Sequence, residues 1–142
     1  IVDIAHDVPP QDLVNAAYLL RDVVPTFPKG TIHVVVVDPG VGTKRRGIVA
    51  SAGSRADGQF FVGPDNGVFG DFVKDWQVHL LENPDYRRAT VSQVFHGRDV
   101  FAPAAAHLAR GVPVELFGPG WEREGLDPYR PVVTADAPLP VA

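Results

Sequence analysis

The chain has 142 residues, of which 45% are hydrophobic, and a formal net charge of −4 at pH 7. This is enough apolar material for one core, and no apolar stretch is long enough to cross a bilayer, so we expect a single domain without a membrane partner. The cations are not massed on one helix face, which argues against a nucleic-acid partner. The absence of cysteine excludes disulfides, thiolate metal sites and cysteine nucleophiles, and it fits a cytoplasmic location.

The first part of the chain predicts a strand, a helix and a second strand in series. Residues 1–4 form a strand-like run, and the prolines that follow it favour a helix start. Apolar residues at helical spacing then predict a helix that stops before Pro25: Leu13, Ala17, Leu20 and Val24. Residues 31–37 are a continuous β-branched run, typical of a strand buried on both faces. This order predicts a βαβ unit.

The next part of the chain predicts shorter elements. Strands are expected at 47–52, 59–63 and 77–81, and a hairpin-like loop at 53–58 joins the first two. Helices are expected at about 68–75 and 100–110, and Gly111 ends the second. These elements together predict an α/β fold in which helices flank a mostly parallel central sheet, an α/β/α sandwich.

Composition divides the chain near residue 118. Residues 1–118 carry all the predicted elements, so we expect one α/β domain there. Residues 119–142 are rich in proline and have the composition of a linker. The chain opens directly on a strand-like run without an initiator methionine, so we expect both ends to be cut.

The most informative motif follows the run at 31–37. Asp38 stands where this strand ends, and a glycine-rich turn leads from it to Arg45. Open α/β sheets bind ligands outside the carboxyl ends of their strands, so a carboxylate and a cation at that edge favour chemistry. A phosphate-binding loop is disfavoured, because its spacing is absent and Asp38 would repel phosphate. A tight Pro-Gly turn with solvated cations is the other interpretation, and spacing alone does not separate the two.

Other polar motifs have both a functional and a structural interpretation. His96 is exposed by its neighbours before a helix, where it could act in chemistry or serve the scaffold. Arg98 and Asp99 could form only a local ion pair. His6 and Asp7 could join Asp38 and His96 in a metal site, but the spacing of known metal motifs is absent, so we expect no metal. Residues 64–67 favour a turn over a binding role.

Five segments, taken in order, resemble the S-adenosyl-L-methionine hydroxide adenosyltransferases. These enzymes hydrolyse S-adenosylmethionine to adenosine and are related to the fluorinases and chlorinases. The resemblance runs over residues 1–118. The segments are His6-Asp-Val-Pro-Pro-Gln-Asp12, Phe27-Pro-Lys-Gly-Thr31, Val36-Val-Asp-Pro-Gly-Val-Gly-Thr43, Gly63-Pro-Asp-Asn-Gly67 and Phe95-His-Gly-Arg-Asp-Val-Phe-Ala-Pro103.

The resemblance implies an activity and a set of site residues. In that family an aspartate, an arginine and a histidine hold and activate the attacking water, and the matching residues are Asp38, Arg45 and His96. The resemblance implies a reaction without metal or organic cofactor. It also implies that the ligand pocket is lined by Gln11, Pro39, Val41, Phe95 and Gly97.

Two other functions stay open. Halogenating relatives have a tyrosine at the position of Asp38, lack the histidine at His96 and carry an inserted loop where this chain has only 53–58, so halogenation is disfavoured. The alternative that is not an enzyme is a module that binds an adenosyl compound and trimerises without catalysis.

The resemblance implies further parts beyond this chain. Family members begin with a strand and loop that carry a ribose-binding aspartate, and they end in a smaller β-barrel domain. Their site lies between the large domain of one subunit and the small domain of its neighbour in a homotrimer. We therefore expect little or no activity from these residues alone.

Overall fold

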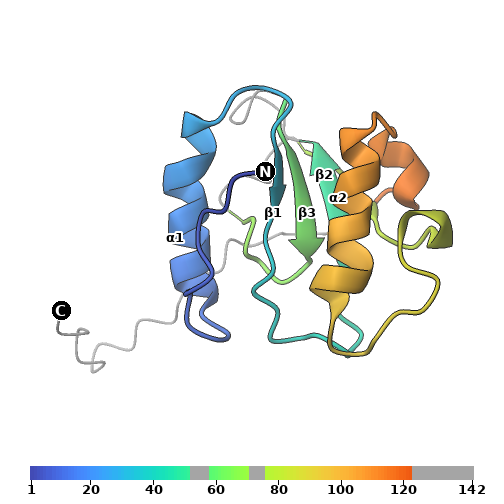
Figure 1. Cartoon of the computed structure of the whole chain (residues 1–142), viewed down its shortest axis with the longest axis horizontal. Helices are drawn as coiled ribbons and strands as arrows, with labels where there is room; N and C mark the ends of the chain where they lie inside the picture. Colours follow the sequence, from blue (N-terminus) through green and yellow to red (C-terminus); the bar gives the residue numbers. More distant parts are fainter. Residues whose placement is uncertain (52–57, 71–75, 123–142) are drawn as a thin grey trace, which may run out of the picture.

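The computed structural model describes residues 1–51, 58–70 and 76–122. A sheet with the strand order β1-β3-β2-β4 forms the middle layer, and α1 and α2 lie on its opposite faces (Figure 1). The elements are α1 (Leu13–Val23), β1 (Ile32–Val34), β2 (Gly47–Ser51), β3 (Phe60–Pro64), β4 (Gln77–Leu80) and α2 (Ala102–Ala109). The predicted α/β class, with helices on both faces of a sheet, is confirmed.

The sheet is mixed, which departs from the mostly parallel sheet expected from the sequence. β1 pairs with β3 in parallel, whereas β2 is antiparallel to both β3 and β4. For β2 and β3 the reason is connection length, because parallel neighbours need a long crossover and strands joined by a short segment return antiparallel. Only a short segment separates β2 from β3. The loop expected at 53–58 lies, except for residue 58, outside the described residues.

The helix α1 forms where the apolar spacing predicts it. Asp12 caps its first turn by accepting a hydrogen bond from the Asn15 backbone N–H at 3.0 Å. Leu13 and Leu20 are buried against one face of the sheet, where they join the cluster around Phe61. The helix passes at Val24–Thr26 into a short 3₁₀ turn that contains Pro25.

The opposite face of the sheet is covered by α2 and the turn before it. Phe101, Ala104 and Leu108 pack there with Val49 and Val62. The helical segment starts earlier than expected, because a π-helical turn, η3 (Gly97–Phe101), precedes α2. The expected helix at 68–75 is a turn over 68–70, and residues 71–75 lie outside the described part of the chain.

The strand predicted at residues 1–4 is wrong, and the strand predicted at 31–37 is present but shorter and at the edge of the sheet. Residues 1–4 form no strand, and Ile1, Val2 and Ile4 are exposed. The predicted central strand at 31–37 is the three-residue β1, which stands at the edge of the described sheet with Val34 exposed. The apolar run predicts burial on two faces, but burial depends on neighbours that local sequence does not specify. No βαβ unit forms among the described residues.

His33 on β1 is buried beside Gln59. Gln59 Nε2 donates to the carbonyls of Val24 and Phe27, so its Oε1 accepts from His33 Nε2 at 2.5 Å. The His33 ring also stacks on Phe61, with ring centroids 5.0 Å apart. Burial lowers the pKa of the His33 imidazole, and the Gln59 hydrogen bond opposes this effect only in part.

We expect the free energy of unfolding to decrease as the pH falls from about 7 to below the ordinary histidine pKa of about 6.5. The unfolded chain binds a proton at His33 in that range, whereas the folded chain resists it because its imidazole pKa is lowered. His33→Phe should be less stable at neutral pH, because Gln59 loses its donor, but should show a flatter pH dependence. Urea unfolding at several pH values measures both effects, and equal slopes would contradict the assignment.

Among the described residues, no helix combines the length and the apolarity that crossing a membrane requires.

Candidate functional site

The pairing of the strands brings three segments to one edge of the sheet. β1 and β3 are parallel, so both end at the same edge, and the antiparallel β2 begins there. Asp38 follows β1, and Arg45 precedes β2. Figure 1 shows the connection between β1 and β2 at this edge, near the start of the helical segment that leads into α2. This is the edge at which open α/β sheets carry their ligands.

The turn between β1 and β2 is compact because its glycines allow close packing. The Val41 N–H donates to the Asp38 carbonyl at 3.2 Å, which closes the first turn. A Cβ on Gly40 would stand 3.1 Å from the Arg45 Cβ, so the missing side chain lets Arg45 fold back over the turn. Gly42 has φ of +75°, and a Cβ there would lie 2.8 Å from the Gln93 carbonyl oxygen. The turn therefore packs against the segment that leads to His96.

Arg45 joins Asp38 and His96 through hydrogen bonds. Its Nε donates to Asp38 Oδ1 at 2.9 Å, and its Nη2 donates to Asp38 Oδ2. The same Nη2 lies 2.9 Å from His96 Nδ1. The Arg45 and Asp38 side chains are only 7% and 6% exposed, so this bidentate pair is largely removed from water. The guanidinium also lies 5.4 Å from the Phe101 ring centroid.

These contacts fix the tautomer of the His96 ring. A guanidinium has no acceptor, so Nη2 must donate and Nδ1 must accept. The neutral ring therefore carries its hydrogen on Nε2. No described residue forms a hydrogen bond with Nε2. The His96 ring can thus donate through Nε2 to a small molecule or a water placed beside it.

The loop that presents His96 is tied down by a buried carboxylate. Asp99 accepts from Arg98 through both of its oxygens, at 2.7 and 2.9 Å, and Oδ2 also accepts from the Ser92 N–H at 2.9 Å. Arg98 and the Ser92 N–H hold the pKa of the Asp99 carboxyl well below its ordinary value. The local ion pair weighed in the sequence analysis is present. The hydrogen bond from the Ser92 N–H to Asp99 joins the two ends of the loop formed by residues 92–99.

The residues predicted to line a ligand pocket fall into two groups and one outlier. Pro39 and Val41 lie in the turn that begins at Asp38, and Phe95 and Gly97 flank His96. Gly97 is packed against β1's continuation, since a Cβ there would lie 3.3 Å from Val36 Cγ1. Four of the five predicted residues therefore lie within three positions of Asp38 or His96 in the sequence.

Gln11 is the outlier. It precedes α1 and is exposed, with no contact to the other predicted residues among the hydrogen bonds of the described chain. Its φ of +67° is unusual for a residue that is not glycine, and strain of this kind is found more often at functional positions.

The residues considered for a metal site form no such cluster in the described part of the chain. His6 lies 3.5 Å from Asp3, on an exposed part of the chain. Within residues 1–51, 58–70 and 76–122, no three histidine or acidic side chains gather in a way that could hold a metal ion.

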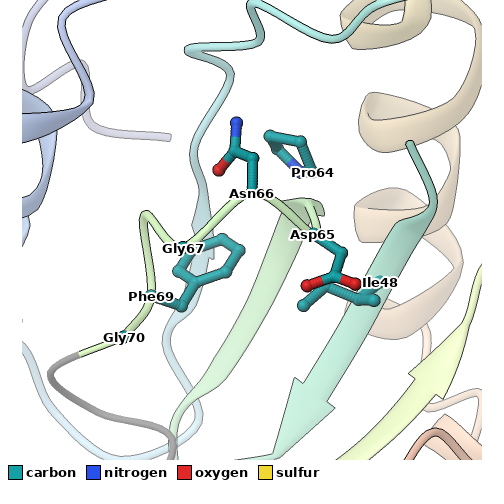
Figure 2. A pocket seen from close by; sticks show the side chains of 7 residues that line it. All are labelled: Ile48, Pro64, Asp65, Asn66, Gly67, Phe69 and Gly70. Atoms are coloured by element: carbon teal, nitrogen blue, oxygen red, sulfur yellow. The ribbon is translucent and has the colours of Figure 1, made fainter. Parts of the chain in front are cut away.

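The sequence interpretation missed a contact made by Asn66. This residue was assigned only to a turn, but its Nδ2 donates to the Val37 carbonyl at 2.8 Å, next to Asp38. Figure 2 shows the Asn66 side chain directed away from Asp65 and Ile48, with which it lines a pocket too narrow for a water molecule. An asparagine at the end of a strand parallel to β1 could have signalled this contact, if the pairing had been known.

The site is that of an α/β domain with a buried aspartate–arginine pair and a histidine at the carboxyl edge of its sheet. Residues 1–118 match the family described as the SAM hydroxide adenosyltransferase N-terminal domain. The chain belongs to this family.

Known proteins resemble the chain over most of its length. It is 47% identical over 133 residues to the (R)-S-adenosyl-L-methionine hydrolase of Thermus thermophilus, covering 84% of this chain and 49% of the relative. A fluorinase of Nocardia brasiliensis is more distant, at 27% identity over 140 residues, covering 83% of this chain and 47% of the relative. A crystal structure of an uncharacterized conserved protein from Thermotoga maritima superposes with a TM-score of 0.80 at 39% identity, covering 87% of this chain and 48% of that one. The chain thus spans about half the length of the curated relatives it matches.

Proposed function

We propose that the protein carrying this chain hydrolyses S-adenosyl-L-methionine to adenosine and L-methionine. The observation that carries the proposal is the sharing of Arg45 Nη2 between Asp38 and His96, which joins the three side chains implied by the family resemblance. The name of the Thermus thermophilus relative, (R)-S-adenosyl-L-methionine hydrolase, supports the same reaction.

The proposed reaction is an in-line displacement at the ribose C5′. A bond forms between the water oxygen and C5′, and the C5′–S bond breaks with its electron pair moving to sulfur. Methionine leaves as a neutral thioether, so its departure needs no acid. The proton lost by water is the only charge that the protein must manage. The chemical demand therefore falls on the nucleophile.

The three side chains divide this task. Each Asp38 oxygen keeps a lone pair beside its bond to Arg45, so the carboxylate can accept the water's proton or orient it. Arg45 places positive charge where hydroxide develops, and His96 Nε2–H can donate to the same oxygen. The burial of the Asp38 and Arg45 side chains away from bulk water strengthens these interactions and the attraction between hydroxide and sulfonium.

The binding assignments belong to the same proposal. Gln11, Pro39, Val41, Phe95 and Gly97 are proposed to line the pocket, partly through their backbone. The mechanism uses neither a metal nor an organic cofactor. We also propose a homotrimer in the cytoplasm, with residues 1–118 as the catalytic domain and 119–142 as a linker towards a further domain, as the resemblance implies.

Product analysis tests the proposal. The natural full-length gene product is incubated with S-adenosylmethionine in ¹⁸O-labelled water, using both sulfonium epimers, with parallel samples that contain chloride, fluoride or a chelator. We expect adenosine labelled at its 5′ oxygen, in the same yield with the chelator. Such labelling would establish direct attack by water.

Each other product points to a different function. A 5′-halo nucleoside would support the halogenase alternative. This alternative is tested because a fluorinase is among the more distant relatives. Binding of S-adenosylmethionine without turnover would support the non-catalytic module. Loss of adenosine in the chelator sample would contradict the metal-free mechanism.

A further inference from the structure

Asn66 connects the end of β3 to the end of β1. Its side-chain Oδ1 accepts from the Val68 N–H at 3.2 Å, and its Nδ2 donates to the Val37 carbonyl at 2.8 Å. Because one partner can only donate and the other can only accept, the two contacts fix which amide atom faces Val37. Figure 2 shows the side chain turned away from its neighbour Asp65.

The backbone ladder between β1 and β3 ends just before the catalytic residues. The Phe60 N–H donates to the Thr31 carbonyl, and the Val35 N–H donates to the Val62 carbonyl. In a parallel pair, the donor that would continue this ladder is the backbone nitrogen of residue 64, which is a proline and has no hydrogen. Among the described residues, no backbone hydrogen bond ties 36–38 to β3. The Asn66 side-chain amide supplies a tie there, two residues further along, at the Val37 carbonyl.

The bond at Val37 acts directly on the position of Asp38. The Val37 carbonyl oxygen and the Asp38 Cα belong to one planar peptide unit, so holding the oxygen holds the point from which the Asp38 side chain extends. Asp38 in turn fixes Arg45 with two hydrogen bonds, and Arg45 reaches His96. A displacement of about 1 Å in such a group can reduce a rate by about 100-fold.

We propose that Asn66 is a positioning residue for the reaction, and this inference rests on the proposed hydrolysis. Its amide ties the chain after β1 to the chain after β3, beyond the point where Pro64 interrupts the ladder, and sets the carboxylate of Asp38 at the attack line. Asn66 itself does not touch the reacting atoms.

Asn66→Asp is the sharpest test, because it keeps the size of the side chain and the acceptor for Val68. The change places a carboxylate oxygen against the Val37 carbonyl, where the amide donated. We expect kcat to fall by about 10- to 100-fold, with KM nearly unchanged. Asn66→Ala, which removes both contacts, provides a second variant with the same expected split.

Asn83 offers a matched control. Its Oδ1 accepts from the Asp85 N–H at 3.0 Å, and its Nδ2 donates to the Leu116 carbonyl at 2.8 Å. Asn83→Asp therefore makes the same chemical change to the same pair of contacts, away from Asp38. We expect it to keep the wild-type kcat. An equal loss of kcat in both variants would overturn the inference.

A double variant tests whether Asn66 acts through Asp38. If it does, Asn66→Asp should lower kcat little further in an Asp38→Asn background. Losses that multiply would show that Asn66 acts independently of Asp38, which would overturn the inference.

A readout that needs no turnover separates this inference from the proposed function. The Arg45 Nε–H is bonded to Asp38 and largely buried, so its proton resonance should exchange slowly with solvent. We expect that protection to be lost in Asn66→Asp and kept in Asn83→Asp. Unchanged protection in Asn66→Asp would overturn the inference, whereas absence of adenosine from the wild-type protein would overturn the proposed function.

Discussion

Asp38→Asn should lower kcat for adenosine formation by about 1000-fold, the largest effect that we expect on activity. The carboxylate accepts two hydrogen bonds from Arg45, whereas an amide offers one acceptor and one donor, so a donor would face the guanidinium. The variant also lacks the charge that can take the water's proton. Steady-state kinetics should show this loss in kcat, with KM changed much less.

Asp22→Asn serves as the control for Asp38→Asn. Asp22 is also beside an arginine, with its oxygen 3.8 Å from Arg21 Nε, but both side chains are exposed. The same change of charge there should leave kcat as in the wild type. If Asp38→Asn kept more than about a tenth of the wild-type kcat, Asp38 could not be the group that handles the proton.

Gly63→Ala should lower the free energy of unfolding by about 3 kcal/mol, at the upper end of the range for overpacked sites. A Cβ at Gly63 would stand 2.4 Å from the Val35 carbonyl oxygen and 2.9 Å from Phe69 Cζ. The backbone oxygen cannot rotate away, so β1 and β3 would have to separate. Thermal unfolding followed by circular dichroism should show a Tm lower by about 10 °C.

Gly120→Ala makes the same substitution where a Cβ meets nothing within 4 Å. It should change the Tm by no more than about 2 °C. A Tm of Gly63→Ala within the same margin would mean that the close approach of β1 to β3 is not a constraint on the fold.

Local patterns predicted the elements whose signals lie within one segment. The helical spacing of Leu13 and Leu20 predicts α1, and the short apolar runs predict β2, β3 and β4 near their observed bounds. The run at 31–37 led to a wrong prediction of a long central strand. Its length and composition suggest one, whereas the position of a strand in a sheet depends on strands that are distant in the sequence. The π-helical start before α2 carries no periodic signal of its own.

The candidate site shows the same division. Asp38 was singled out from the residues alone, because a carboxylate at a strand end has a physical meaning. That Asp38 and His96 belong to one site is predicted only by the family resemblance, because 58 positions separate the two residues and no spacing rule relates them. The sequence does not reveal the contact of Asn66 with Val37, because asparagine is common both in turns and in hydrogen bonds between neighbouring chain segments. The parallel pairing of β1 and β3 is needed to distinguish the two uses.

The π-helical turn η3 determines how Arg45 is enclosed. Arg45 contacts His96 on one side and faces the Phe101 ring on another, and these residues are five positions apart. In an α-helix, five positions correspond to a rotation of about 500°, so the two side chains would diverge by about 140°. In a π turn, residues five apart lie more nearly on one side of the helix, because the backbone bond joins residues five apart, as from the Ala102 N–H to the Gly97 carbonyl. The wider π turn therefore lets the His96 imidazole and the Phe101 ring face the same Arg45 guanidinium.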